Sequence, residues 1–99
     1  MLFVNIIKSY RHVVAICDSE LLGKYFEEDN LQLDVKKSFY KGEEVSEDQV
    51  EKIIQDMSIE DATFNIVGNK AVKLAVKMNL IEPNSVKEIS GVKYAMVLL

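Results

Sequence analysis

The chain has 99 residues, of which 48% are hydrophobic and 28% charged, with four glycines, one proline and one cysteine. This length and composition predict a single globular domain over residues 1–99 that folds without disulfides or a structural metal, and they exclude a disordered chain. The net charge of −4 argues against bulk electrostatic attraction to nucleic acid or to an anionic membrane.

Charge is distributed unevenly along the sequence. Residues 1–61 carry seven basic and fourteen acidic side chains, whereas residues 62–99 carry five lysines and two glutamates. An asymmetry between halves of this kind indicates a charged partner.

The N-terminal apolar run is too short to span a bilayer, and it lacks the basic leader and the cleavage site of a signal peptide. The single cysteine cannot form an internal disulfide, so the composition does not indicate an oxidising compartment. The sequence therefore predicts a cytoplasmic protein with no membrane partner.

Two apolar runs rich in β-branched residues, LFVNII and HVVAIC, predict a pair of strands. Both faces of the second run are apolar, which predicts a central strand covered on both sides, or with a partly sheltered second face. The next segment, DSELLG, predicts a short helical turn that Asp18 caps and that Gly23 ends in a left-handed conformation. KYF and LQLDV, on either side of EEDN, predict a hairpin with an acidic tip.

The clearest helical pattern begins at Ser46, which has the capping-box spacing to Gln49. The apolar residues behind it recur at helical spacing and predict an amphipathic helix over residues 46–57 with an acidic outer side. A second helix is predicted within NIVGNKAVKLAVKMNLIEP. We favour Asn65 as its N-cap and Pro83 just beyond its end; the alternative is a strand to Val67 and a helix that begins at Asn69.

The last segments, VKEI and VKYAMVLL, are joined by Ser-Gly and predict a C-terminal hairpin. Strands at both ends of the chain and helices in the middle predict an α+β fold. The expected architecture is a two-layer sandwich in which a mixed or antiparallel sheet carries two main helices, mostly on one face.

The catalytic inventory of the sequence is small. Cys17 ends an apolar strand and lies at an odd offset from His12, so the two side chains of one unbroken strand point to opposite faces. We therefore predict that Cys17 is a buried hydrophobe and not a nucleophile. One cysteine and one histidine cannot complete a zinc shell, and the acidic run at 27–29 lacks the spacing of a calcium loop. Gly23-Lys24 lacks the rest of a P-loop, and no metal or other cofactor is predicted.

Two groups of residues are candidates for binding. The first is a polar or anion site at the start of the second helix, where free N–H groups and the helix dipole favour negative charge. The second is a basic stripe at helical spacing, whose alternative role is a solvated helix face. The polar group consists of Asp18, Glu20, Lys24, Asn65, Gly68 and Asn69, and the stripe of Lys70, Lys73 and Lys77.

Four ordered motifs, CDSELLGK, FYKGE, NIVGNKAVKLA and ISGV, resemble those of a small archaeal family of domains of unknown function, numbered 424. The resemblance covers nearly the whole chain and implies a cytoplasmic archaeal α/β domain that stands alone, without an established activity. It also implies a gene encoded near genes for translation and ribosome assembly, which is an association and not a mechanism. The chain has Lys93-Tyr94 where the family often shows Pro-His, so an activity that needed this histidine would not be open to this chain.

These observations rank three hypotheses. The first is a non-enzymatic binding module that acts on a protein or ribonucleoprotein partner of the translation apparatus, with direct RNA binding disfavoured by the acidic half of the chain. The alternative is a small enzyme or small-anion-binding protein that uses Asp18, Glu20, Lys24 and the Asn65–Gly68 turn. The third is a homo-oligomer in which edge strands, or the last strand, pair between chains.

Overall fold

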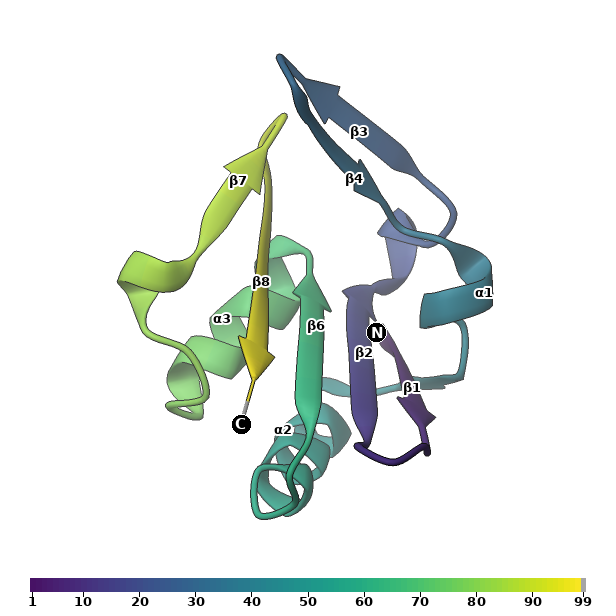
Figure 1. The fold of residues 1–99 in the computed structure, drawn as a ribbon, viewed down its shortest axis with the longest axis vertical. Coiled ribbons are helices and arrows are strands. Elements are labelled where there is room, and N and C mark those ends of the chain that lie inside the picture. The colour runs from purple at the N-terminus through teal and green to yellow at the C-terminus, as the bar shows by residue number, and fades with distance from the viewer. Residues whose placement is uncertain (99) are drawn as a thin grey trace.

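A computed structural model describes residues 1–98, which form a six-stranded sheet, a separate two-stranded hairpin and three α-helices (Figure 1). The main sheet consists of β1 (Leu2–Ile7), β2 (Val13–Asp18), β5 (Glu43–Val45), β6 (Thr63–Val67), β7 (Lys87–Ile89) and β8 (Val92–Leu98). The hairpin consists of β3 (Tyr25–Glu28) and β4 (Leu31–Asp34). The helices are α1 (Lys37–Tyr40), α2 (Glu47–Met57) and α3 (Asn69–Lys77), with 3-10 turns η1 (Ser19–Leu21) and η2 (Pro83–Ser85).

The strand order in the main sheet is β5-β1-β2-β6-β8-β7. The central pair, β2 and β6, is parallel, and every other neighbouring pair is antiparallel. A parallel pair needs a long crossover connection, and here residues 19–62 supply it. The sheet is therefore mixed, and the predicted α+β class is confirmed.

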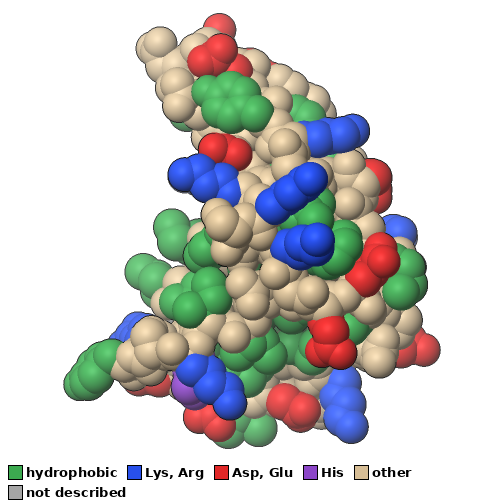
Figure 2. Space-filling view, turned by 90° about the vertical axis from the view of Figure 1, so that its right-hand side faces the viewer, with side chains coloured by type: hydrophobic (Ala, Val, Ile, Leu, Met, Phe, Trp, Pro, Cys, Tyr) green, Lys and Arg blue, Asp and Glu red, His purple; other side chains and the backbone are tan. Residues whose placement is uncertain are grey.

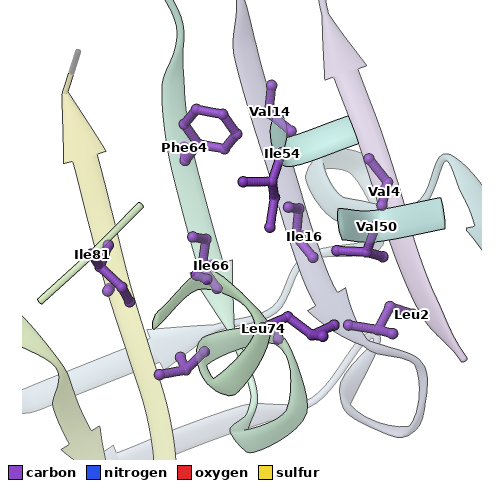
Figure 3. Packing of buried hydrophobic residues seen from close by; sticks show 14 of the residues in the cluster. Leu2, Val4, Val14, Ile16, Val50, Ile54, Phe64, Ile66, Leu74 and Ile81 are labelled. Carbon is purple, nitrogen blue, oxygen red and sulfur yellow. The ribbon is translucent and has the colours of Figure 1, made fainter. Parts of the chain in front are cut away.

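The two main helices lie on one face of the sheet, which we call the helical face (Figure 1). Apolar residues of α2 and α3 pack there against alternate residues of the central strands, as the predicted amphipathic patterns require. Each large side chain buried in this way contributes roughly 1.5–3 kcal/mol of stability. Figure 3 shows the centre of this core, which includes Leu2, Val4, Val14, Ile16, Val50, Ile54, Phe64, Ile66, Leu74 and Ile81.

The opposite face, which we call the hairpin face, is covered over one half by α1 and by the β3–β4 hairpin (Figure 1). Ala15 and Cys17 of β2 are fully buried on this side, so the prediction of a central strand covered on both sides is confirmed. At the hairpin end, the Ser90 N–H donates to Glu28 Oε1 at 2.7 Å and the Ser90 hydroxyl donates to the Glu27 carbonyl at 3.2 Å. The acidic tip of the hairpin thus fastens to the β7–β8 turn.

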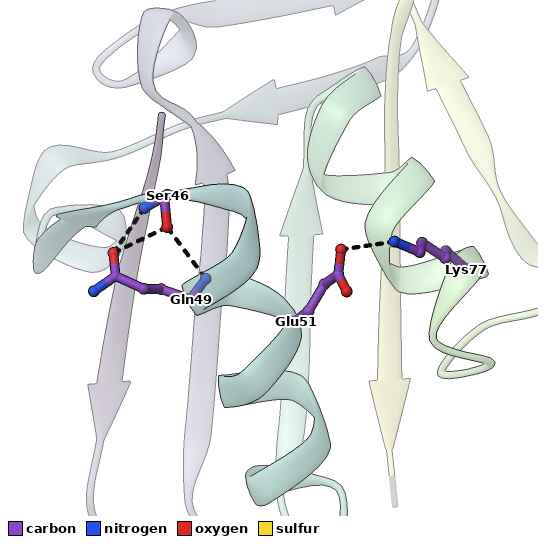
Figure 4. A network of polar contacts seen from close by, with 4 residues as sticks. All are labelled: Ser46, Gln49, Glu51 and Lys77. Atoms are coloured by element: carbon purple, nitrogen blue, oxygen red, sulfur yellow. Dashed lines mark hydrogen bonds and ion pairs between the residues drawn. The ribbon is translucent and has the colours of Figure 1, made fainter.

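The predicted capping box of α2 is confirmed (Figure 4). The Ser46 hydroxyl accepts from the Gln49 N–H at 3.3 Å, and the Ser46 N–H donates to Gln49 Oε1 at 2.9 Å. These bonds satisfy amides that the first turn of a helix otherwise leaves without partners.

The predicted N-cap at Asn65 is wrong, and the alternative is correct: β6 runs to Val67 and α3 begins at Asn69. Residues 63–67 pair with β2 on one side and with β8 on the other, and this double ladder outweighs the local capping preference of asparagine. The helix also ends early, at Lys77, so Pro83 does not follow it directly and instead opens η2.

The predicted C-terminal hairpin is confirmed by the pairing of β7 with β8. Ser90 and Gly91, which join the two strands, both have positive φ values, 50° and 81°. This combination matches the twist of a two-residue hairpin turn. The last residue of the predicted strand, Leu99, lies outside the described residues.

Candidate functional site

Asp18 is the most deeply buried charged residue of the polar group, with 5% of its surface exposed. Its carboxylate accepts hydrogen bonds from the first turn of α3, at 3.0 Å from the Lys70 N–H and at 2.8 Å from the Ala71 N–H. Because β2 and β6 are parallel neighbours, the end of β2 lies beside the point where β6 leads into α3. Asp18 is therefore a helix cap for α3, supplied from a distant part of the chain.

The sequence predicted a cap of a different turn, and that prediction is wrong. Asp18 precedes η1, but its side chain makes no capping bond there. The predicted left-handed conformation of Gly23, by contrast, is confirmed by a φ of 84°.

Gly68 stands between the end of β6 and the start of α3, with a φ of 114° that L side chains rarely adopt. A Cβ atom at this position would lie 2.6 Å from each carboxylate oxygen of Asp18. The glycine is therefore required both for the backbone conformation and for the approach of the carboxylate to the helix.

The first turn of α3 is also fastened to β8. The Gly68 N–H donates to the Lys93 carbonyl at 2.7 Å, and the Lys93 N–H donates to Asn69 Oδ1 at 3.0 Å. The Asn69 side chain thus adds one hydrogen bond beyond the end of the ladder between β6 and β8. Two of the candidate polar residues, Gly68 and Asn69, therefore have structural roles.

Burial raises the pKa of Asp18, and the hydrogen bonds from the Lys70 and Ala71 amides oppose that shift. An internal carboxylate already uses two of the free amides on which the anion-site hypothesis relied. The geometry supports capping as the role of Asp18.

A hollow of about 320 Å³ lies beside this cap, lined by Asp18, Glu20, Leu21, Asn69, Lys70 and Val92. Three of the six candidate polar residues meet in it, and Gly68 contacts Asp18 directly. The other two do not line it. Asn65 lines a separate hollow under the hairpin with Tyr94, and the exposed Lys24 lies between η1 and β3.

Cys17 is fully buried on the hairpin face, and burial, reinforced by the charge of Asp18, raises the pKa of its thiol to about 12. A thiol of this kind stays protonated at neutral pH, whereas nucleophilic attack needs the thiolate. Within residues 1–98, no group of three histidine, cysteine or acidic side chains is placed to hold a metal ion.

We expect iodoacetamide to leave Cys17 of the native protein unmodified at neutral pH. The rate of modification should rise only in the denaturant range where the protein unfolds, because unfolding exposes the thiol and restores its ordinary pKa. Mass spectrometry of the alkylated protein, run beside a circular-dichroism unfolding curve, measures both. Fast modification of the folded protein would show that Cys17 is reactive.

A larger groove, of about 510 Å³, runs along α3 on the other side of Asn69. Its lining combines apolar side chains of the helix and of the segment from η2 to β7 with polar and charged ones. The apolar residues are Val72, Val76, Pro83 and Val86, and the polar and charged residues are Asn69, Lys73, Glu88 and Lys93. Sequence reasoning missed this groove, because it predicted that the second helix continues almost to Pro83. In the structure the helix ends at Lys77, and the segment that contains Pro83 and Val86 lies beside the helix and lines the groove with it.

The three lysines of the predicted basic stripe have different neighbours in the structure. The Lys77 ammonium forms an ion pair with Glu51 of α2 at 2.9 Å, which raises the pKa of Lys77 (Figure 4). Lys73 lines the groove, and Lys70 lines the hollow beside the cap formed by Asp18. Of the three lysines, only Lys73 lines the groove.

Figure 2 shows Lys and Arg side chains gathered on the side of the molecule that carries α1, away from the groove. Three exposed lysines lie in this helix or directly beside it: Lys36, Lys37 and Lys41. These lysines belong to residues 1–61, whose net charge is negative. A net charge summed over each half of the sequence therefore does not reveal this basic group.

Comparison with known proteins identifies the family. The model of a family described as "Protein of unknown function (DUF424)" matches residues 7–99, and the chain belongs to this family. The resemblance seen in the sequence motifs is thereby confirmed.

The fold is similar to that of an uncharacterized conserved protein from Methanopyrus kandleri, with a TM-score of 0.79 and 24% sequence identity. The match covers 97% of this chain and 89% of that one. No curated protein matches. None of the helices within residues 1–98 is both long enough and apolar enough to cross a membrane.

Proposed function

We propose that this chain is a non-enzymatic binding module that acts on a protein or ribonucleoprotein partner of the translation apparatus in the cytoplasm. The groove along α3 is the observation that carries the proposal. The translation apparatus and the cytoplasmic location both enter from the family resemblance, and the single buried cysteine is compatible with a reducing compartment.

The groove has the chemistry of a contact surface for a protein segment. Its lining contains three valines and a proline beside two lysines and Glu88. Protein interfaces typically combine apolar side chains, which supply affinity, with charged side chains, which supply orientation. A segment that places an apolar side chain between acidic residues would complement this surface.

The residues with catalytic chemistry support the same conclusion. The Asp18 carboxylate is bonded to backbone amides, and the Cys17 thiol is buried and protonated. The Asp18 side chain joins β2 to α3, and the Cys17 side chain packs in the core on the hairpin face. The residues that an enzyme would use for acid–base or nucleophilic steps are therefore engaged in the fold.

We expect Lys73→Glu to reduce the recovery of partner proteins from a lysate of the source organism about tenfold, because it reverses a charge in the lining of the groove. Lys77→Glu is the matched control, because it makes the same charge change one helical turn away and outside the groove. The exposed ion pair with Glu51 that it removes contributes little to stability. Quantitative mass spectrometry of proteins captured on the immobilised chain, with and without nuclease, compares the two variants.

Proteins that are lost with Lys73→Glu and kept with Lys77→Glu identify the groove as the contact. Recovery that survives nuclease indicates direct protein contact, and recovery that nuclease abolishes indicates bridging by RNA. Equal recovery with wild type and with both variants would exclude the groove.

A further inference from the structure

The outer edge of β8 is open over half of its length. On its inner side, β8 pairs with β6 along residues 94–98. On its outer side, β7 pairs only with residues 92–94, and no strand of the described chain continues that pairing along Ala95–Leu98 (Figure 1).

The backbone groups that face outwards can be assigned from the pairing. The Gly68 N–H donates to the Lys93 carbonyl, so Lys93 directs its polar groups towards β6. Successive residues of a strand alternate in this direction, and therefore Ala95 and Val97 also bond towards β6. Met96 and Leu98 direct their N–H and C=O groups to the open edge.

The open edge lacks the features by which sheet edges usually avoid pairing. Its four residues, AMVL, contain no charge and no proline. Met96 and Leu98 are also exposed apolar side chains, at 66% and 71%. The other end of the sheet differs, because β5 has only three residues and exposes Glu43 and Glu44.

We propose that the open edge of β8 pairs in the antiparallel sense with the same edge of a second copy of the chain, about a two-fold axis at Val97. A row of outward amide and carbonyl groups is a template on which another extended strand can pair. An antiparallel pair of identical strands has two-fold symmetry, so the edge is complementary to itself. The two sheets would become one continuous sheet.

The free groups fix the register. With the axis at Val97, Met96 of one copy lies opposite Leu98 of the other, and each such pair exchanges both of its backbone bonds. With the axis at Met96 instead, Leu98 of one copy would lie opposite Tyr94 of the other and would have to bond to it. The outward N–H and C=O groups of Tyr94 already pair with Lys87 of β7. In the register at Val97, the exposed Met96 and Leu98 side chains meet across the axis on the hairpin face, because opposite residues point to the same side.

This contact involves a few residues of each chain and is smaller than the interface of an obligate dimer. The expected assembly is a weak dimer that forms at micromolar or higher concentration. The groove along α3 is lined by other residues, so dimerisation and partner binding are separate properties of the surface.

Sedimentation velocity over a concentration series, from micromolar to near-millimolar protein, tests the pairing with two charge variants. The double variant Met96→Lys/Leu98→Lys places like charges opposite each other across the axis, and we expect it to weaken dimerisation at least about tenfold. The double variant Met96→Lys/Leu98→Glu places opposite charges at the same two contacts, and we expect it to dimerise as wild type or more tightly. Both variants introduce charges at the same exposed positions, so loss of apolar area is matched.

A wild-type protein that stays monomeric throughout the series would overturn the proposal, as would a Lys/Lys variant that dimerises like wild type. Equal loss of dimer in both variants would overturn the register at Val97. Lys73→Glu is expected to leave dimerisation unchanged, which separates this test from that of the groove.

Discussion

Gly68→Ala is expected to destabilise the protein by about 4 kcal/mol. Two costs add. A side chain at a φ of 114° strains the backbone by roughly 1–3 kcal/mol. The new Cβ atom would also lie 2.6 Å from both carboxylate oxygens of Asp18, and overpacking of this kind costs roughly 1–3 kcal/mol.

Gly91→Ala is the matched control for this substitution. Gly91 also has a positive φ, 81°, but a Cβ atom there would meet nothing within 4 Å. We therefore expect it to cost only the backbone strain, about 1 kcal/mol. Urea unfolding followed by circular dichroism measures both variants, and equal destabilisation of the two would contradict the close contact between Gly68 and Asp18.

Asp18→Ala is expected to destabilise the protein by about 3 kcal/mol. The substitution removes the acceptor of two amides in the first turn of α3, and a buried amide without a partner costs roughly 1–3 kcal/mol. Asp18→Asn keeps one side-chain oxygen as an acceptor and should fall between alanine and wild type. The same urea experiment measures both variants, and an Asp18→Ala protein as stable as wild type would exclude the capping role.

The two substitutions should not be additive. In the double variant Gly68→Ala/Asp18→Ala the Cβ atom no longer meets a carboxylate, so only the backbone strain and the lost cap remain. We expect the double variant to be more stable than the sum of the single variants by about 1–3 kcal/mol. Additive losses would show that the two residues act independently.

Patterns within one element were predictable from the sequence. The capping box at Ser46 and Gln49 depends on residues three positions apart, and the structure contains both of its bonds. The apolar residues of β2 predicted a strand buried on both sides, and the two core clusters lie on its two faces. In each case the deciding interactions are local or depend only on the alternation of side chains.

Interactions between distant segments were not predictable in this way. The carboxylate of Asp18 bonds to Ala71, 53 positions along the chain, whereas a local pattern directs a capping aspartate to the turn that follows it. Asn65 has the residue type of an N-cap but lies in a strand that is paired on both sides. The groove forms because the segment that contains Pro83 and Val86 lies beside α3. The sequence pattern of neither the segment nor the helix predicts this contact.

Hydrogen exchange of the wild-type chain, free and with the partner fraction recovered by capture, tests the binding account most directly. We predict that exchange slows in α3 and in residues 83–88, which line the groove. The same amides should be unaffected when the fraction is tested with the Lys73→Glu variant. Slower exchange confined to α1 or to the hairpin, with the groove unchanged, would contradict the account and move the contact to the other side of the molecule.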